Sequence, residues 1–328
     1  MSILKLREML WEITPQCDKG CSYCGSKDIL KKKPLCGKDL LNIAKQIGEY
    51  GVEEVTLTGG EPGVLAENNP KLFSEIISIL ESYEVKIKAV TYGKLIEVLV
   101  EVDVDKFDVF GVSINLPQDM SDAYLSYNNN ITMITNFGKH NIWDFDKLAE
   151  HAEEFNCWQI QLTMGDELLG PDGIMHLRNK IKDCPINTII MPADNLQVSH
   201  SCAAGINSCS ITYDGDVVAC LSERSYGGIK KTYGSLLDKN SSLGEIWENE
   251  FKDTRFSGCR KCCRDCIQYP PSTDLTSIME DFVLPSNKDI TLPPTSIQMY
   301  AVVNPRRSND HWREPPRSSG PMIYGVWP

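Results

Sequence analysis

The chain has 328 residues, of which 41% are hydrophobic and 24% are charged, as is usual for globular proteins. Its formal net charge of −12 argues against direct binding of duplex nucleic acid through the overall field. No apolar run is long enough for a signal peptide or a membrane span, so we expect a cytoplasmic protein without a membrane partner. In that reducing compartment, thirteen clustered cysteines indicate metal or redox sites rather than disulfides.

Short β-rich segments alternate with helical patterns from about residue 8 to about residue 192. The strand-like segments end, in order, at Thr14, Gly60, Gly93, Leu116, Phe137, Met164 and Pro192. Apolar spacing predicts helices over 37–51, 69–83 and 141–155. This alternation predicts a parallel sheet with helices outside it, and it fits a closed or partly closed barrel and an open doubly wound sheet equally well. In either fold, ligands bind at the carboxyl ends of the strands.

A different pattern begins near residue 200. Seven of the thirteen cysteines lie between residues 200 and 266, where Asp214-Gly215 predicts a hairpin turn and 241–253 predicts a short helix. Residues 267–328 contain no cysteine and ten of the eighteen prolines, and they have no helical or strand period over most of their length. We interpret this tail as a linker, with a cap over the barrel mouth or an occupant of the substrate channel as alternatives.

Three cysteines follow the first predicted strand. Cys17, Cys21 and Cys24 form a C-x3-C-x2-C pattern, with Tyr23 directly before the last thiol. Iron–sulfur cubes are held by cysteine thiolates, normally four, so three would leave one iron open to a small molecule. A zinc site with a fourth ligand is the structural alternative.

This motif resembles that of the radical S-adenosylmethionine superfamily. The resemblance implies a partial (β/α)6 TIM-like barrel as the core over residues 8–195, with a [4Fe-4S] cluster on Cys17, Cys21 and Cys24. It also implies that the open iron is chelated by S-adenosylmethionine, which is cleaved to a 5′-deoxyadenosyl radical that takes a hydrogen atom from the substrate. A one-electron reductant such as flavodoxin or ferredoxin is the expected partner.

A second motif, "TLTGGEP", ends the second predicted strand. In the family, the corresponding glycines and glutamate hold the methionine amino group, and a threonine and a serine on the next two strands lie near the cofactor. The resemblance therefore assigns cofactor binding to Gly59, Gly60, Glu61, Thr91 and Ser113. Tyr92 stands where the family more often has asparagine, which is a departure beside Thr91. The sequence identifies no catalytic side chain.

The later cysteines resemble the SPASM or twitch domain that follows many of these cores. We expect a small cysteine-rich domain over residues 200–266, of the shorter twitch type, with one auxiliary [4Fe-4S] cluster on Cys202, Cys220, Cys259 and Cys262. Cys263 and Cys266 form an alternative second pair, Cys209 is a seventh candidate, and a second cluster or a structural zinc site stays open. An unligated Cys209, Cys263 or Cys266 could return a hydrogen atom to a substrate radical, as thiols do in family epimerases.

The family resemblance also implies a range of functions. Modification of a ribosomally made peptide is our first expectation. Since we see no leader-binding module before the first strand, such a substrate would need a separate leader-binding protein or another route into the site. A dehydrogenase or epimerase of a small molecule or nucleotide is the alternative, and a non-catalytic iron–sulfur or zinc protein is the second alternative.

Overall fold

The computed structural model describes the core almost continuously and the later residues in part. The described residues are 5–99, 106–125, 131–155, 157–163, 169–182, 184, 188–191, 204–205, 207–221, 229, 231–252 and 301–303. All statements about structure below refer to these residues.

Eleven strands form one curved sheet in the order β10-β9-β8-β1-β2-β3-β4-β5-β6-β7-β11. The strands are β1 (Glu8–Thr14), β2 (Glu54–Gly59), β3 (Lys86–Thr91), β4 (Val109–Ser113), β5 (Ile131–Phe137), β6 (Cys157–Leu162), β7 (Thr188–Met191), β8 (Ser208–Ile211), β9 (Asp216–Val218), β10 (Thr232–Ser235) and β11 (Ala301–Val303). Strands β1 to β7 are consecutive parallel neighbours, and β8 pairs in parallel with the other edge of β1. The described strands do not close on themselves, so the sheet is a partial barrel.

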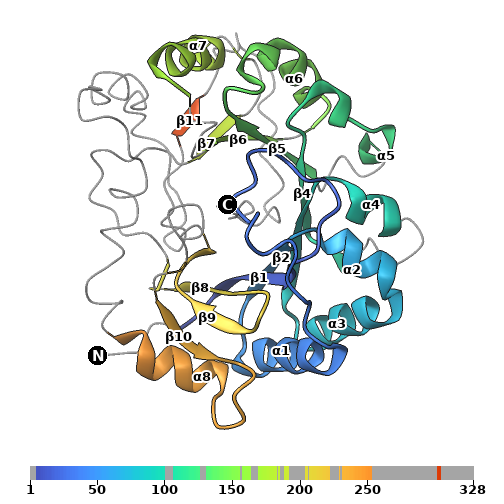
Figure 1. The fold of residues 1–328 in the computed structure, drawn as a ribbon, viewed down its shortest axis with the longest axis vertical. Coiled ribbons are helices and arrows are strands. Elements are labelled where there is room, and N and C mark those ends of the chain that lie inside the picture. Colours follow the sequence, from blue (N-terminus) through green and yellow to red (C-terminus); the bar gives the residue numbers. More distant parts are fainter. Residues whose placement is uncertain are drawn as a thin grey trace, which may run out of the picture.

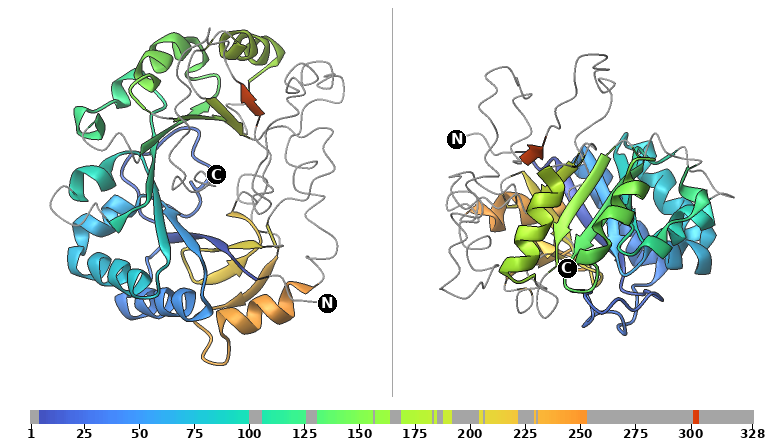
Figure 2. Two further views of the ribbon diagram at one scale, coloured as in Figure 1. Left: turned by 180° about the vertical axis from the view of Figure 1, so that it is seen from behind. Right: turned by 90° about the horizontal axis from the view of Figure 1, so that it is seen from above.

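Helices cover the outer side of this arc. They are α1 (Gly37–Tyr50), α2 (Pro62–Asn68), α3 (Pro70–Ser82), α4 (Lys94–Leu99), α5 (Asp122–Leu125), α6 (Phe145–Ala152) and α7 (Pro171–Lys182), with short turns η2 (Pro117–Asp119) and η4 (Ile142–Asp144). Figure 1 shows α1 to α7 arranged around the outside of the curved sheet, and Figure 2 shows the same arrangement from behind. The loop between β1 and α1, in blue, crosses the open middle of the arc in Figure 1.

The sequence pattern explains why the sheet buries one face under helices. Along β1 and β6, alternate residues such as Trp11 and Trp158 lie in the main hydrophobic cluster, together with helix residues such as Phe73 and Phe145. Strand side chains alternate between faces, so the intervening residues point to the inner side of the arc. In each βα unit, the outward-facing apolar residues of the strand therefore pack against the helix, and the inward-facing residues of the strand line the barrel.

The predicted fold class is confirmed, since the core is a partial α/β barrel rather than an open doubly wound sheet. The predicted helices over 37–51 and 69–83 correspond closely to α1 and α3, while 141–155 divides into η4 and α6. Four helices were missed: α2, α4, α5 and α7. Of these, α2 had a readable start signal, because Glu61 caps its N-terminus and Pro62 occupies its first turn.

The hairpin predicted at Asp214-Gly215 is present as β8 and β9, and the predicted helix after it is the single turn α8 (Leu243–Glu245) followed by the π-helical turn η7 (Ile246–Glu250). Two strands were missed. One is β10, antiparallel to β9, and the other is β11, a strand within the tail for which we predicted no period. Since β8 pairs with β1, the hairpin continues the sheet of the core.

None of the helices in the described ranges combines the length and the apolar character that a membrane span requires.

Charged side chains are buried at the end of the arc where the strands begin. Lys88 Nζ lies 2.6 Å from Glu54 Oε1, and both side chains are buried. Glu8 stands opposite Glu54 in the β1–β2 register. Burial, and next the charge of Glu54, raise the pKa of Glu8 to about 7, although Lys88 lowers it.

This raised pKa predicts a pH-dependent stability. Native Glu8 holds a proton between about pH 4.5 and 7 that the unfolded chain has released, so the folded protein loses stability as the pH rises through this window. We expect Glu8→Gln to become more stable relative to the wild type by roughly 2–3 kcal/mol between pH 5 and pH 8, measured by urea unfolding.

Glu53→Gln is the matched control. Glu53 is exposed, and its hydrogen bond from Arg7 lowers its pKa, so its removal should give no such gain at pH 8. Parallel stability curves for Glu8→Gln and the wild type would contradict the prediction.

Candidate active site

The three-cysteine loop joins β1 to α1 at the carboxyl end of β1. Cys17, Cys21 and Cys24 are all half-buried in it. Tyr23, directly before the third thiol, stacks on His140 with ring centroids 4.4 Å apart and an interplanar angle of 14°. This stack connects the cysteine loop to the loop after β5.

The base of this loop lies against the glycine pair that ends β2. The Gly60 N–H donates to Thr14 O and the Glu61 N–H donates to Gln16 O, both at 2.7 Å. A Cβ atom on Gly60 would lie 2.1 Å from Gln16 O, and Gly59 has a φ of +127°. The glycines therefore allow two backbone segments to approach each other, and both also line the pocket described below.

Glu61 is held by three hydrogen bonds inside the protein. Its Oε1 accepts from the Gly63 N–H at 2.8 Å and from the Thr91 hydroxyl at 2.6 Å, and its Oε2 accepts from the Tyr92 N–H at 2.9 Å. Burial raises the pKa of Glu61 to about 7, and the hydrogen bonds from Thr91, Tyr92 and Gly63 oppose that rise. Its orientation is therefore fixed by α2 and β3.

The structure places Thr91 behind Glu61 rather than on a pocket wall. Thr91 is fully buried, and its oxygen also accepts from the N–H groups of Gly93 at 3.0 Å and Leu95 at 3.2 Å. Thr91 thus positions Glu61, while Ser113 at the end of β4 lines the same pocket as the three thiols.

Tyr92, the departure from the family pattern, and Lys94 both hold Asp18 of the cysteine loop, and Lys94 of α4 also contacts α2. Its hydroxyl donates to Asp18, and Lys94 Nζ lies 2.7 Å from Asp18 Oδ2 and 2.8 Å from Glu67 Oε2. Burial raises the pKa of Asp18, but the hydrogen bonds from Lys94 and Tyr92 outweigh it and hold that pKa below its usual value. Asp18 is therefore ionised and keeps the loop attached at neutral pH.

A second ion pair holds the other side of the loop. Lys19 Nζ lies 3.0 Å from Asp119 Oδ1, and Asp119 Oδ2 accepts from the N–H groups of Asn115 at 3.1 Å and Leu116 at 2.9 Å. Lys19 is thereby connected to the end of β4.

Two asparagines that neither sequence motif includes also face the site. Asn115 Oδ1 accepts from the Asn136 N–H at 2.6 Å, and the buried Asn141 donates to the carbonyls of Asn115 at 2.7 Å and Asn136 at 2.9 Å. The sequence contained a signal for both residues, because Asn115 and Asn136 each stand near the carboxyl end of a predicted strand, where ligands bind in such folds.

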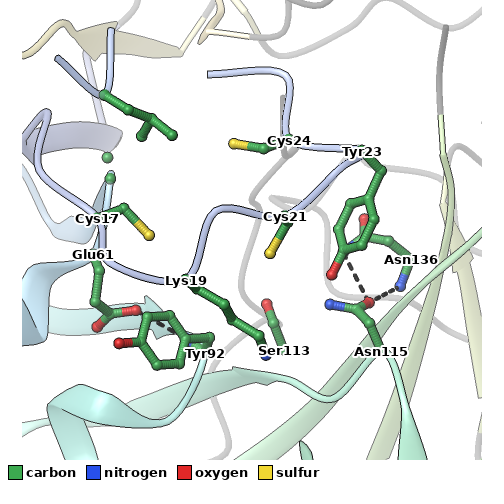
Figure 3. Close-up of a pocket in the computed structure, with 13 residues that line it drawn as sticks. Cys17, Lys19, Cys21, Tyr23, Cys24, Glu61, Tyr92, Ser113, Asn115 and Asn136 are labelled. Atoms are coloured by element: carbon green, nitrogen blue, oxygen red, sulfur yellow. Dashed lines mark hydrogen bonds between the residues drawn. The ribbon is translucent and has the colours of Figure 1, made fainter. Parts of the chain in front are cut away.

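The three thiols, Glu61 and the two asparagines Asn115 and Asn136 line one pocket (Figure 3). Its lining residues are Cys17, Lys19, Cys21, Tyr23, Cys24, Leu30, Gly59, Gly60, Glu61, Tyr92, Ser113, Asn115 and Asn136. The empty space of this pocket, counted together with its open mouth, is about 540 Å³. The cysteine motif and the glycine–glutamate motif, about forty residues apart in the chain, thus share one cavity.

The donors present fit an iron–sulfur cube better than a single ion. Figure 3 shows the sulfurs of Cys17, Cys21 and Cys24 pointing toward a common space. Within the described part of the chain, no three His, Cys, Asp or Glu side chains are close enough together to hold one metal ion. In a cube, each thiolate binds a different iron, so the sulfurs stand further apart than around one ion.

Burial keeps two of the three thiols protonated when no metal is bound. Burial raises the pKa of Cys24 to about 11 and raises the pKa of Cys17 as well. Without a metal these groups stay protonated at neutral pH, and the positive charge of iron is what would ionise them.

The remaining cysteines have different surroundings. Cys220 follows β9 and is half-buried, while Cys209 faces Met9 of β1 inside the main hydrophobic cluster. Burial raises the pKa of Cys209, so its thiol stays protonated and packed within the core. Cys36 is exposed and donates to Asp39. The predicted ligands Cys202, Cys259 and Cys262 and the alternatives Cys263 and Cys266 lie outside the described residues.

The chain is similar to known proteins in sequence and in fold. Residues 11–158 match the radical SAM superfamily model, and residues 202–267 match the SPASM iron–sulfur cluster-binding domain. A GTP 3',8-cyclase from Staphylococcus haemolyticus is 32% identical over 82 residues, which is 23% of this chain and 24% of that protein.

Among solved structures, Streptococcus suis SuiB bound to its precursor peptide SuiA superposes with a TM-score of 0.59 at 15% identity, covering 79% of this chain and 67% of SuiB. The enzyme anSMEcpe with bound AdoMet and the Kp18Cys peptide superposes with a TM-score of 0.58 at 14% identity, covering 76% and 82% of the two chains. At these identities the likeness establishes the fold alone. The two family matches together span more than half of the 328 residues. The chain therefore belongs to the radical S-adenosylmethionine superfamily and carries a SPASM iron–sulfur cluster-binding domain.

Proposed function

We propose that the pocket binds a [4Fe-4S] cluster through Cys17, Cys21 and Cys24 and presents its open iron to S-adenosylmethionine. When bound, the reduced cluster would pass one electron to S-adenosylmethionine, whose sulfonium bond would break to give methionine and a 5′-deoxyadenosyl radical that takes a hydrogen atom from the substrate. The observation that carries the proposal is the set of three thiols in one cavity with Glu61, whose carboxylate is already bonded within the protein.

The side chains around the thiols suit the polar groups of S-adenosylmethionine. Glu61 Oε2 accepts one hydrogen bond, from Tyr92, and so retains acceptor capacity for an ammonium group. Lys19 offers a positive charge near the cluster loop for a carboxylate. Ser113, Asn115 and Asn136 offer hydroxyl and amide groups at the ends of β4 and β5. Thr91 acts through Glu61, which it holds in place.

We further propose that the substrate is a peptide. The fold likeness to SuiB with its precursor peptide and to anSMEcpe with a bound peptide supports this class. Buried polar side chains on the inner strand faces, such as Gln159 and Gln161, would suit the donors and acceptors of a peptide backbone. A reductant such as flavodoxin or ferredoxin and a separate leader-binding protein remain part of this proposal.

A nucleotide is the second candidate substrate. The sequence match to GTP 3',8-cyclase supports it, although that match spans about a quarter of either protein. A small molecule of this kind would need no leader-binding partner.

The auxiliary domain is proposed over residues 200–266, after a core over 8–195 and before the tail over 267–328. We propose that Cys202, Cys220, Cys259 and Cys262 bind one auxiliary [4Fe-4S] cluster, with Cys263 and Cys266 as the alternative pair. The family match over residues 202–267 supports this assignment, and the half-buried position of Cys220 leaves its thiol accessible to a cluster.

The first test removes one proposed ligand of the cluster. Cys21→Ala should abolish the formation of 5′-deoxyadenosine from S-adenosylmethionine and dithionite, because two thiols cannot retain the cube. Cys36→Ala is the control, since Cys36 is exposed and its thiol donates to the nearby Asp39. Equal activity in both variants would refute the proposed cofactor site.

The second test counts iron. We expect about eight irons per chain in anaerobically reconstituted protein and about four in Cys220→Ala. Cys209→Ala lies in the same hairpin but in the hydrophobic cluster, so its iron content should equal that of the wild type. About four irons in the wild type would show that no auxiliary cluster forms.

The third test separates the two substrate classes. We expect GTP to leave the rate of 5′-deoxyadenosine formation unchanged, and a precursor peptide encoded beside the gene to raise it. Mass spectrometry of the peptide should then show a loss of hydrogen. A GTP-dependent product with no change in the peptide would favour the nucleotide substrate instead.

A further inference from the structure

We propose that the inner face of β6 and the residue directly after it carry a substrate-binding site, built from Gln159 and Thr163, that takes an extended peptide segment. This inference rests on the proposed function, because it names where a peptide substrate would be held. Neither residue belongs to the pocket of the cysteine loop.

The inner face of the barrel is polar, in contrast to the interior of closed eight-stranded barrels. In closed eight-stranded barrels the interior is filled mainly by bulky branched apolar side chains. Here the inner stripes of the described strands contribute buried polar residues such as Thr56, Ser113, Thr132, Gln159, Gln161 and Ser210. The second hydrophobic cluster contains only Val90 and Ile134, with Val109 beside it. The inner face of the barrel, here called the lumen, therefore suits a polar ligand.

The strand register fixes the level of Gln159 in this lumen. Ser113, Ile134 and Gln159 stand opposite one another across β4, β5 and β6. Ser113 and Asn136 both line the pocket, so Gln159 lies two strands from Ser113, roughly 10 Å at about 4.8 Å per strand, and one strand from Asn136. On its own strand, the neighbours Trp158 and Ile160 belong to the outer hydrophobic cluster, which leaves Gln159 on the inner face.

Gln159 is fully buried, and within the described part of the chain neither Oε1 nor Nε2 has a hydrogen-bond partner. The hydroxyl of Thr163 is likewise buried and, among the described residues, lacks a partner. A buried polar group without a partner costs stability, so a native protein retains one chiefly where a ligand or water completes it. Other buried amides are satisfied within the protein: Asn141, for example, makes three hydrogen bonds.

The geometry of the two groups suits a peptide in extended conformation. A carboxamide presents a donor and an acceptor side by side, and each residue of an extended strand presents its own N–H and C=O toward the same side. Thr163 lies four positions further along the same face, about 13 Å from Gln159 at roughly 3.3 Å per residue. A segment of about four residues running along β6 would reach both.

The test uses the full-length protein, reconstituted anaerobically and saturated with S-adenosylmethionine without reductant. The probe is N-acetylglycine N-methylamide, whose glycine carries one N–H and C=O pair, and its dissociation constant is measured by ligand-observed NMR. We expect Gln159→Leu to weaken binding about tenfold. The ester analogue O-acetylglycolic acid N-methylamide lacks the glycine N–H, so it should bind the wild type more weakly and the variant equally.

Thermal unfolding separates a binding role from a structural one. Gln159→Leu removes an unpartnered buried amide, so its unfolding midpoint should equal or exceed that of the wild type. Gln46→Leu is the matched control, because Gln46 bonds Leu236 O at 3.0 Å and the Leu243 N–H at 3.1 Å. That variant should unfold at a lower temperature and bind the probe normally.

Two results overturn the inference: equal probe binding by the wild type and Gln159→Leu, including no binding by either, or a loss of stability in Gln159→Leu as large as in Gln46→Leu. The dithionite assay distinguishes a failure of this site from a failure of the proposed function. If S-adenosylmethionine is not cleaved but probe binding depends on Gln159, the proposed function fails and the lumen site stands. If S-adenosylmethionine is cleaved but probe binding does not depend on Gln159, only the lumen site fails.

Discussion

Two backbone hydrogen bonds hold the candidate site together. The N–H groups of Gly60 and Glu61 donate to the carbonyls of Thr14 and Gln16, and so connect the end of β2 to the base of the cysteine loop. Only glycine fits at position 60, because any side chain would collide with the carbonyl of Gln16. The position of the thiols relative to Glu61 is therefore set by main-chain geometry rather than by flexible side chains.

Around these bonds, side-chain interactions orient the remaining groups. Thr91 and Tyr92 fix Glu61 from β3, while the Asp18–Lys94 ion pair holds the loop from α4. Such support is what a site needs when its ligand must be held in one orientation. The same residues explain how Tyr92 replaces the family's usual asparagine, since its ring lines the pocket while its hydroxyl bonds Asp18.

The fold was predictable where the pattern is strong and local. Apolar stripes and turn signals identified β1 to β7, α1, α3 and the β8–β9 hairpin. The short helices α4 and α5 have four to six residues, too few for a periodic signal, and β10 owes its structure to pairing with β9 rather than to its own sequence.

The same limit applies to the site. The residue types of the two motifs indicated which groups would share a pocket, because their chemistry is specific. Whether Thr91 contacts a ligand or supports Glu61 depends on the direction of its hydroxyl group, and the sequence does not give that direction. The buried but unpartnered amide of Gln159 could not be read from sequence either, because a glutamine in a strand looks the same with or without a partner.

The pairing of β8 with β1 has a consequence for where the two cysteine-bearing regions stand. The hairpin reverses direction after β8, and Val218 lies level with Leu10, so Cys220 returns toward the level at which β1 begins. Cys17 follows the opposite end of β1, six residue steps or about 20 Å away. The length of the rigid strand β1 thus sets the separation between the two thiol regions along the sheet.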